Sequence, residues 1–191
     1  MPLCGLRIEV GPLSFFNPNT TTCKSLMEKA VEYLSLQKTD VLLDIFSGVG
    51  TIGLCAAAHC ARVIGVEIVE EAVENARANA ALNGIDNAEF HVGKAEDLVP
   101  KIVGDLDPEL DVCAVVDPSR AGLHPRVVNA LRSRRQVSRI VYISCNPESL
   151  AEDVAKMGVS TDGEEDDLVP VSAVAVDSFP QTLHVEMILK Q

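Results

Sequence analysis

The chain has 191 residues and a formal net charge of −12, and 47% of its residues are hydrophobic. This length and composition predict one soluble globular domain, and because the chain holds no run of roughly 18 apolar residues, a membrane-spanning helix is excluded. The acidic charge argues against a free-standing nucleic-acid binder, which would present lysines and arginines to phosphates. An RNA partner would need a local basic patch or a further domain.

The six cysteines are scattered along the chain, without a C-x-x-C pair and without zinc-like spacing to the four histidines. We therefore expect no metal site, and we expect buried thiols in a reducing compartment. Residues 1–10 show neither a signal peptide nor a transit peptide. The expected location is intracellular, in the cytosol or nucleus rather than the mitochondrion.

The N-terminal part of the chain is expected to form a strand, a helix and a second strand. Residues 6–10 are predicted to be a strand, and Asn19 or a following threonine can cap a helix over about 22–36. The apolar run 41–46 is typical of a buried parallel strand. We expect residues 1–36 to cover the turn that follows this strand.

A glycine-rich turn comes next and opens onto a helix of small residues. Its spacing fits the dinucleotide-binding fingerprint, and Glu67 ends the next apolar run, 62–67, where a ribose-binding acid would lie. NAD and S-adenosylmethionine both present an adenosine ribose, so this geometry serves either ligand. The glycines concerned are Gly48, Gly50 and Gly53.

Asp44, just ahead of the turn, favours S-adenosylmethionine. A carboxylate at this place would repel a pyrophosphate, whereas it suits the cationic sulfonium and amino groups of the methyl donor. Nicotinamide binding is the second interpretation of the turn. A flavin site, or a βα turn that binds nothing, comes below both.

The rest of the chain alternates between strands and helices and ends in two successive strands. This order predicts an α/β fold with a doubly wound, mostly parallel seven-stranded sheet and a C-terminal antiparallel hairpin. Such an ending is typical of Rossmann-like methyltransferases rather than dehydrogenases. The expected elements are helix 70–83, strand 87–92, strand 111–116, helix 125–133, strand 139–143, a helix ending near 157, and strands 171–176 and 183–189.

Cys145 is a candidate nucleophile because it follows a strand and precedes Asn146 and Pro147, a good helix cap and a good first helical residue. A thiol at a helix N-terminus is favoured as the thiolate. The nearby acids Asp117 and Glu148 would oppose this effect. The alternative is a small buried side chain, which is the usual role of a lone cysteine.

Glu186 is a candidate general base, because it lies within an apolar strand and shares a face with His184. A dry, unpaired carboxylate there costs several kcal/mol. It is therefore ion-paired at a wet edge or held at an active site with a raised pKa. Loops that begin at Asp117, at Cys145 and at 177–182 leave the same edge of the predicted sheet as the glycine turn.

Three of these segments carry a resemblance to a known family. The run 176–186 resembles the C-terminal signature of the RNA 5-methyluridine methyltransferases, and 144–147 resembles their nucleophile loop. The run 117–122 is similar to their Asp-Pro-Pro-Arg-x-Gly element, with Ser119 in place of the second proline. Within the family, the fuller likeness is to the eukaryotic tRNA enzymes that methylate the T-loop uridine.

The resemblance implies a role for each matching residue. Cys145 would add to C6 of a flipped-out uracil, and Glu186 would remove the C5 proton after methyl transfer. Asp117 would position both base and cofactor, while Arg120 would orient Asp117 or form a structural ion pair. The implied contacts to S-adenosylmethionine are Asn17, Phe46, Gly48, Gly50, Thr51, Glu67 and Asp117, with Asn17 standing where glutamine is usual.

The resemblance also implies the partner, which is a tRNA substrate. Family members usually carry additional N-terminal RNA-binding structure, so we expect residues 1–191 to be a single catalytic domain, the C-terminal part of a longer protein. One alternative is a ribosomal-RNA methyltransferase of the same family. Another is a domain that binds tRNA without turnover.

Overall fold

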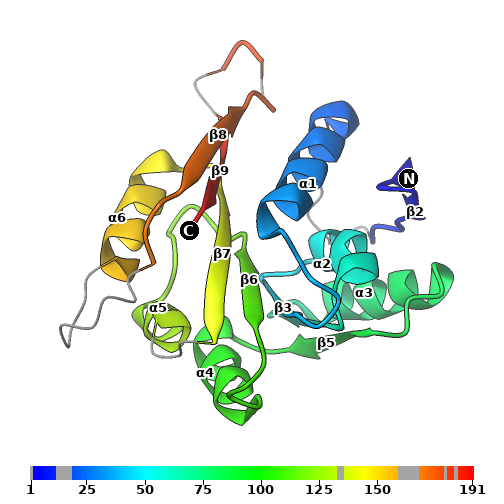
Figure 1. Cartoon of the computed structure of the whole chain (residues 1–191). Helices are drawn as coiled ribbons and strands as arrows, with labels where there is room; N and C mark the ends of the chain where they lie inside the picture. The colour runs from blue at the N-terminus through cyan, green and yellow to red at the C-terminus, as the bar shows by residue number, and fades with distance from the viewer. Residues whose placement is uncertain (1, 12–18, 133–135, 159–167, 179, 183–184) are drawn as a thin grey trace.

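The computed structural model describes residues 2–11, 19–132, 136–158, 168–178, 180–182 and 185–191. A sheet of seven strands runs through the centre of this part of the chain, as Figure 1 shows. The strands are β3 (Val41–Ile45), β4 (Arg62–Glu67), β5 (Ala88–Val92), β6 (Val112–Val116), β7 (Val137–Ser144), β8 (Ser172–Val176) and β9 (Glu186–Lys190).

The order of strands across the sheet is β5-β4-β3-β6-β7-β9-β8. The first five are parallel, and β9 runs antiparallel between β7 and β8. The chain proceeds outward from β3 in one direction through β4 and β5, and in the other through β6 and β7. The predicted doubly wound sheet with a C-terminal antiparallel hairpin is therefore confirmed, and a crevice is expected beyond the carboxyl ends of β3 and β6.

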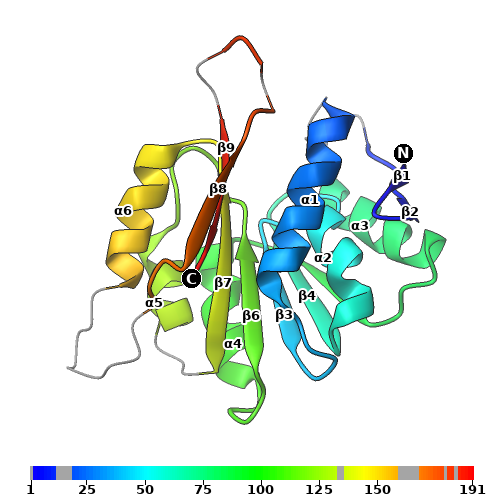
Figure 2. The same cartoon turned by 45° about the horizontal axis from the view of Figure 1, so that its top comes forward.

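Helices cover both faces of the sheet, and Figure 2 separates the two layers. The first three helices pack on one face and the last three on the other, so each face has its own buried cluster of apolar side chains. The helices are α1 (Thr20–Leu34), α2 (Thr51–Ala56) with the short 3-10 turn η1 (Ala57–His59), α3 (Glu70–Leu82), α4 (Ala95–Asp105), α5 (Pro125–Arg132) and α6 (Pro147–Met157).

The central strands are apolar except for Asp44, because both of their faces are covered. Leu42 and Val115 belong to the cluster under the first three helices, whereas Leu43 and Val116 belong to the cluster under the last three. Every residue of β3 and β6 is buried. The centre of the sheet is thus enclosed by side chains on both faces, and the loops at the carboxyl ends of its strands remain accessible to form a site.

The N-terminal segment differs from its prediction. A short strand β2 (Leu6–Arg7) pairs with β1 (Pro2–Leu3) in a separate two-stranded sheet, and the predicted strand 6–10 is wrong beyond Arg7. The reason is a contact with a distant segment: the backbone N–H and carbonyl of Glu9 bond to the side chain of Asn79 instead of to a neighbouring strand.

Two helices differ from the prediction. The predicted cap of α1 forms, since the side chain of Asn19 accepts a hydrogen bond from the Thr22 N–H, but the helix ends at Leu34, before a left-handed Ser35. Helix α4 has no counterpart among the predicted helices, because Pro100 lies inside it and proline removes a helical hydrogen bond. No helix in the described ranges is long and apolar enough to cross a membrane.

Candidate active site

The glycine turn leaves β3 through a left-handed residue. Phe46 has a φ of 66°, followed by Gly48 at 54° and Gly50 at 79°. The N–H groups of Phe46 and Ser47 both donate to the carbonyl of Val66, at 2.8 and 3.1 Å, which holds the turn against β4. A left-handed conformation costs a non-glycine residue about 1 kcal/mol, and such strain is concentrated at functional sites.

The three glycines of the turn differ in what surrounds them. A Cβ on Gly48 would meet no heavy atom within 4 Å, so its backbone is open to a ligand. A Cβ on Gly50 would lie 2.8 Å from the ring of Phe90, and one on Gly53 would lie 2.7 Å from Oδ2 of Asp44. Of the two glycines predicted to contact a cofactor, Gly48 lies in open space and Gly50 is needed for packing. Thr51, the first residue of α2, is half-buried.

Asp44 is buried behind the turn, with 1% of its surface exposed. Its Oδ2 accepts a hydrogen bond of 2.8 Å from the N–H of Gly53 and so fastens α2 to β3. Burial raises the pKa of Asp44 to about 7, and the negative charge of Glu67 acts in the same direction. We predicted that this carboxylate would face a sulfonium. Too little of its surface is exposed for direct contact, and its bond to Gly53 stabilises the turn instead.

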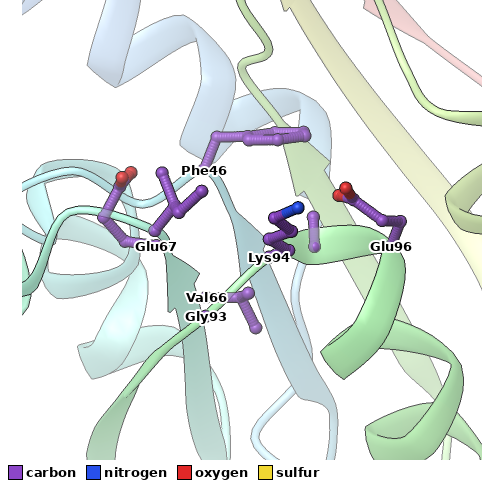
Figure 3. A pocket seen from close by; sticks show the side chains of 8 residues that line it. Phe46, Val66, Glu67, Gly93, Lys94 and Glu96 are labelled. Carbon is purple, nitrogen blue, oxygen red and sulfur yellow. The ribbon is translucent and has the colours of Figure 1, made fainter.

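A pocket of about 100 Å³ opens beyond β4 and β5. In Figure 3 the ring of Phe46 lies over it, with Glu67 on one side and Lys94 and Glu96 on the other. The Glu67 carboxylate accepts from the N–H groups of Gly48, at 3.1 Å, and Val69, at 2.9 Å, and it keeps lone pairs for a ligand's hydroxyls. The pocket is lined by Phe46, Val66, Glu67, Ile68, Gly93, Lys94, Ala95 and Glu96.

Cys145 lies in the short segment between β7 and α6 and is half-buried. Asn146 forms the predicted cap, its side chain accepting from the N–H of Glu148 at 3.2 Å, and Pro147 is the first helical residue. The hydroxyl of Ser144 donates to the carbonyl of Asn146 and accepts from its N–H. These bonds fix the backbone on both sides of the thiol.

The other cysteines are poorer nucleophiles. Four of them are buried, and burial raises the pKa of the Cys23 and Cys60 thiols to about 11, with the same direction at Cys55 and Cys113. They are held as neutral thiols away from solvent. Cys145 and Cys4 are the two that solvent partly reaches, and Cys145 alone lies at the carboxyl edge of the main sheet.

Glu186 reaches the same edge from a strand that runs the opposite way. Met187 of β9 pairs with Ser144, the last residue of β7. Glu186 comes one residue before Met187 and Cys145 one residue after Ser144, so both adjoin the end of the same ladder. The side chain of Glu186 is half-buried, and desolvation raises its pKa. Within the described residues no cation forms a salt bridge with Glu186, so the ion-paired alternative finds no support there. His184 lies outside the described residues.

Asp117 leaves the sheet where β3 and β6 diverge, and its N–H donates to the carbonyl of Ile45 at 3.3 Å. Asp117 is exposed to solvent. Desolvation, then the negative charges of Glu186 and Asp44, raise its pKa, and the exposed face reduces this effect. Asp117 is thus the middle member of a line of acids that runs from the glycine turn toward Glu186.

Among the described residues, Arg120 is a predicted site residue that does not join this group. Arg120 is exposed, and in the part of the chain that the structure describes its guanidinium forms no ion pair with Asp117. Its backbone carbonyl instead accepts a hydrogen bond of 3.0 Å from the side-chain amide of Asn146. Asn17 lies outside the described residues.

Two polar residues that the sequence analysis did not single out hold the site together. Asp153, 2% exposed, accepts from the N–H of Leu123 at 2.6 Å and from the hydroxyl of Tyr142 at 2.8 Å. Asn79, on α3, is fully buried. Each lies on the apolar stripe of its helix, and a polar residue in such a stripe is the sequence signal that could have revealed it. The described residues contain no cluster of three metal-ligating side chains.

Comparison with known proteins identifies the family of this chain. The profile of the tRNA (uracil-5-)-methyltransferase family matches residues 8–190, which is nearly the whole chain. The chain belongs to this family. The resemblance found in the catalytic loops is therefore confirmed.

Similar members of the family include two mammalian proteins. The mouse tRNA (uracil-5-)-methyltransferase homolog A is 42% identical over 98% of this chain, and the human homolog A is 41% identical over 98%. The chain spans only 31% and 30% of those two proteins. The crystal structure of Pyrococcus abyssi tRNA (uracil-54, C5)-methyltransferase in complex with S-adenosyl-L-homocysteine is 36% identical, with a TM-score of 0.75, and covers 96% of this chain and 41% of that one.

Proposed function

We propose that this chain is the catalytic region of an S-adenosylmethionine-dependent methyltransferase that acts on C5 of a uridine in tRNA. The carrying observation is the pairing of Met187 with Ser144, because Glu186 and Cys145 adjoin this last pair of the ladder, at the edge of the sheet that also holds Asp117. A thiol and an unpaired, half-buried carboxylate at one edge are the two groups that this reaction needs. Family membership supports the reaction class.

The residues around the pocket fit an adenosine. Glu67 can take ribose hydroxyls on the lone pairs that its two backbone donors leave open, and the ring of Phe46 offers an apolar face. The open backbone of Gly48 lets the rest of the ligand approach the turn. S-adenosylmethionine would supply the methyl group, and the Pyrococcus relative holds its product, S-adenosyl-L-homocysteine.

Cys145 begins the proposed reaction. Its thiolate adds to C6 of the uracil, which saturates the 5,6 double bond and makes C5 a carbon nucleophile. C5 then attacks the methyl group of S-adenosylmethionine. A carbon–carbon bond forms, and the bond between that methyl group and the sulfonium sulfur of the donor breaks.

Glu186 completes the reaction as the general base. It removes the remaining proton from C5, the 5,6 double bond re-forms, and the bond from C6 to the sulfur of Cys145 breaks. A carboxylate whose pKa is raised by burial is a stronger base than an ordinary one and suits this step. Asp117, between the two sites, is the residue proposed to position the uracil and the cofactor, and Arg120 would turn toward it when RNA binds.

The proposed substrate is tRNA, and the T-loop uridine is the proposed target. The printed functions of the mammalian and archaeal relatives support the first point, and the archaeal one names uracil-54. Because the chain has a net charge of −12 and spans under a third of the mammalian relatives, we propose that tight RNA binding needs the rest of a longer protein.

The test uses a T-arm RNA that carries 5-fluorouridine, together with S-adenosylmethionine. Fluorine at C5 cannot leave as a proton, so the reaction should stall as a covalent, methylated adduct that mass spectrometry detects. Wild type is compared with Cys145→Ala and with Cys4→Ala, the other partly exposed cysteine, as the matched control. We expect an adduct with wild type and Cys4→Ala, and none with Cys145→Ala.

The contrary results are distinct. An adduct of equal yield with Cys145→Ala would refute the nucleophile. Adduct formation with a ribosomal-RNA hairpin but not with the T-arm would move the substrate to the other RNA class. Binding of NAD in place of S-adenosyl-L-homocysteine, seen as thermal stabilisation, would refute the cofactor.

A further inference from the structure

Two asparagines on α3 hold the N-terminal arm, defined here as residues 2–9. Asn83 bonds both backbone groups of Arg7: its Oδ1 accepts from the N–H at 2.9 Å and its Nδ2 donates to the carbonyl at 2.8 Å. Asn79 does the same for Glu9, at 2.8 and 2.9 Å. The two asparagines lie one helical turn apart, and the residues that they bind, Arg7 and Glu9, lie two positions apart. The side-chain amides therefore present donors and acceptors to the arm as the edge of a β-strand would.

Each asparagine makes a third bond, but the two lead to different places. Nδ2 of Asn83 donates to the carbonyl of Asn79 at 2.7 Å, within α3, whereas the third bond of Asn79 leaves the helix. Nδ2 of Asn79 also donates to the carbonyl of Val49 at 3.2 Å, inside the glycine turn. Asn79 is fully buried, and these three bonds use its acceptor and both of its donors. One amide group therefore ties the arm and the turn together, while Asn83 ties only the arm.

The position of the Val49 carbonyl matters because it lies between two left-handed glycines. Gly48 and Gly50 flank it, with φ values of 54° and 79°. Left-handed glycines have many accessible conformations, so a fixed carbonyl between them reduces the freedom of the whole turn. The N–H of Gly48, which bonds to Glu67, is separated from the fixed carbonyl of Val49 by one peptide group.

We propose that Asn79 is a positioning residue that couples docking of the N-terminal arm to the ligand-ready shape of the glycine turn. Docking of the arm orients the Asn79 amide, and the amide orients the Val49 carbonyl. By reciprocity, a ligand that binds to the ordered turn stabilises the docked arm. The ligand part of this inference rests on the proposed function, whereas the coupling of arm and turn does not.

The experiment measures amide hydrogen exchange and S-adenosyl-L-homocysteine affinity on the whole 191-residue chain. Saturating ligand should slow exchange at the Glu9 amide of the wild type severalfold, since that amide belongs to the arm and not to the pocket. In Asn79→Ala this response should vanish, and the Kd should rise about tenfold, the usual effect of one lost buried hydrogen bond with partners left unpaired.

Asn83→Ala is the matched control, because it loses the equivalent clamp on Arg7 but no bond to the turn. Its Arg7 amide should exchange faster while its Kd stays within about twofold of the wild type. If saturating S-adenosyl-L-homocysteine left amide exchange in the wild-type arm unchanged, the proposal would be overturned. So would equal losses of affinity in the two variants, because they would mean a general loss of stability.

A further variant, Ile8→Ala, keeps the proposal testable if Asn79→Ala does not fold or if the wild type does not bind S-adenosyl-L-homocysteine. Ile8 is a buried residue of the arm, with 1% of its surface exposed. Undocking the arm in this way should speed exchange of the Gly50 amide without any ligand. Unchanged exchange at Gly50 would refute the coupling itself, whereas absent ligand binding alone would refute the proposed cofactor.

Discussion

The side-chain amide of Asn146 donates a hydrogen bond of 3.0 Å to the backbone carbonyl of Arg120. This bond joins the segment after β7, which carries Cys145, to the loop after β6, which carries Asp117. A second tether lies deeper, where Asp153 on α6 accepts from the N–H of Leu123. Cys145 and Asp117 are therefore placed by one connected unit, and loosening either tether should disturb both.

Gly122→Ala should destabilise the chain by about 2–4 kcal/mol. Gly122 has a φ of 76°, and a Cβ there would lie 2.4 Å from Oδ2 of Asp153, so the tether must shift. Gly84→Ala is the matched control, since Gly84 has a φ of 64° but no heavy atom within 4 Å of the added carbon. It should cost only about 1 kcal/mol. Urea unfolding measures both, and equal losses would mean that Asp153 gives way freely.

Glu186→Gln should trap the enzyme on an ordinary uridine substrate. The amide cannot remove the C5 proton, so the methylated adduct with Cys145 should accumulate while turnover falls roughly 10²–10⁴-fold. A denaturing gel with labelled RNA detects the adduct, and Glu152→Gln, an exposed residue of α6, serves as the control that keeps turnover. Full turnover by Glu186→Gln would remove Glu186 from the mechanism.

The buried carboxyl of Asp44 should make stability fall as pH rises. Its pKa is about 7 in the folded chain and near its ordinary value of 3.8 in the unfolded one, so between these values the folded state keeps a proton that the unfolded state releases. The stabilising contribution is therefore complete below about pH 4 and is lost toward pH 7. Asp44→Asn, whose amide oxygen can still accept from Gly53, should show a flatter dependence in urea unfolding.

Asp117 and Glu186 have raised pKa values as well, so some slope of the same sign should persist in Asp44→Asn. Identical slopes in wild type and variant would show that Asp44 titrates normally. A steeper slope in the variant would contradict the stated sign.

Phe46→Gly should separate ligand affinity from stability. Removing the side chain relieves a left-handed strain of about 1 kcal/mol, which offsets the packing that the half-buried ring loses. The Kd for S-adenosyl-L-homocysteine should rise about tenfold, since the apolar cover of the pocket is gone. Calorimetry and urea unfolding measure the two quantities. A large loss of stability with unchanged affinity would assign the ring to the core alone.

The sheet and its catalytic edge could be predicted because their signals are local. Continuous apolar runs such as 112–116 indicate strands covered on both faces. The rule that loops at the carboxyl ends of parallel strands share an edge brings Asp117 and Cys145 together. The capping pattern of Asn146 and Pro147 gave the start of α6 correctly.

The features that escaped prediction depend on contacts between distant segments. Residues 8–10 look like a continued strand, but Glu9 finds its partner on α3, 70 residues away. Asp44 looks like a ligand group, yet Gly53 takes its carboxylate inward. Helix α4 carries Pro100, which reads as a helix breaker until the sheet packing is known. No periodicity in the sequence reports such pairings.

The register of β9 against β7 also determines to which face of the sheet the side chain of Glu186 points. Because side chains alternate between the faces of a strand, a slip of β9 by one residue against β7 would point Glu186 to the opposite face and put an apolar neighbour in its place at the end of the ladder. A chain misfolded in this way would keep its glycine turn and pocket. It would be a soluble, ligand-competent but chemically silent protein, distinguishable from the active form only through catalysis.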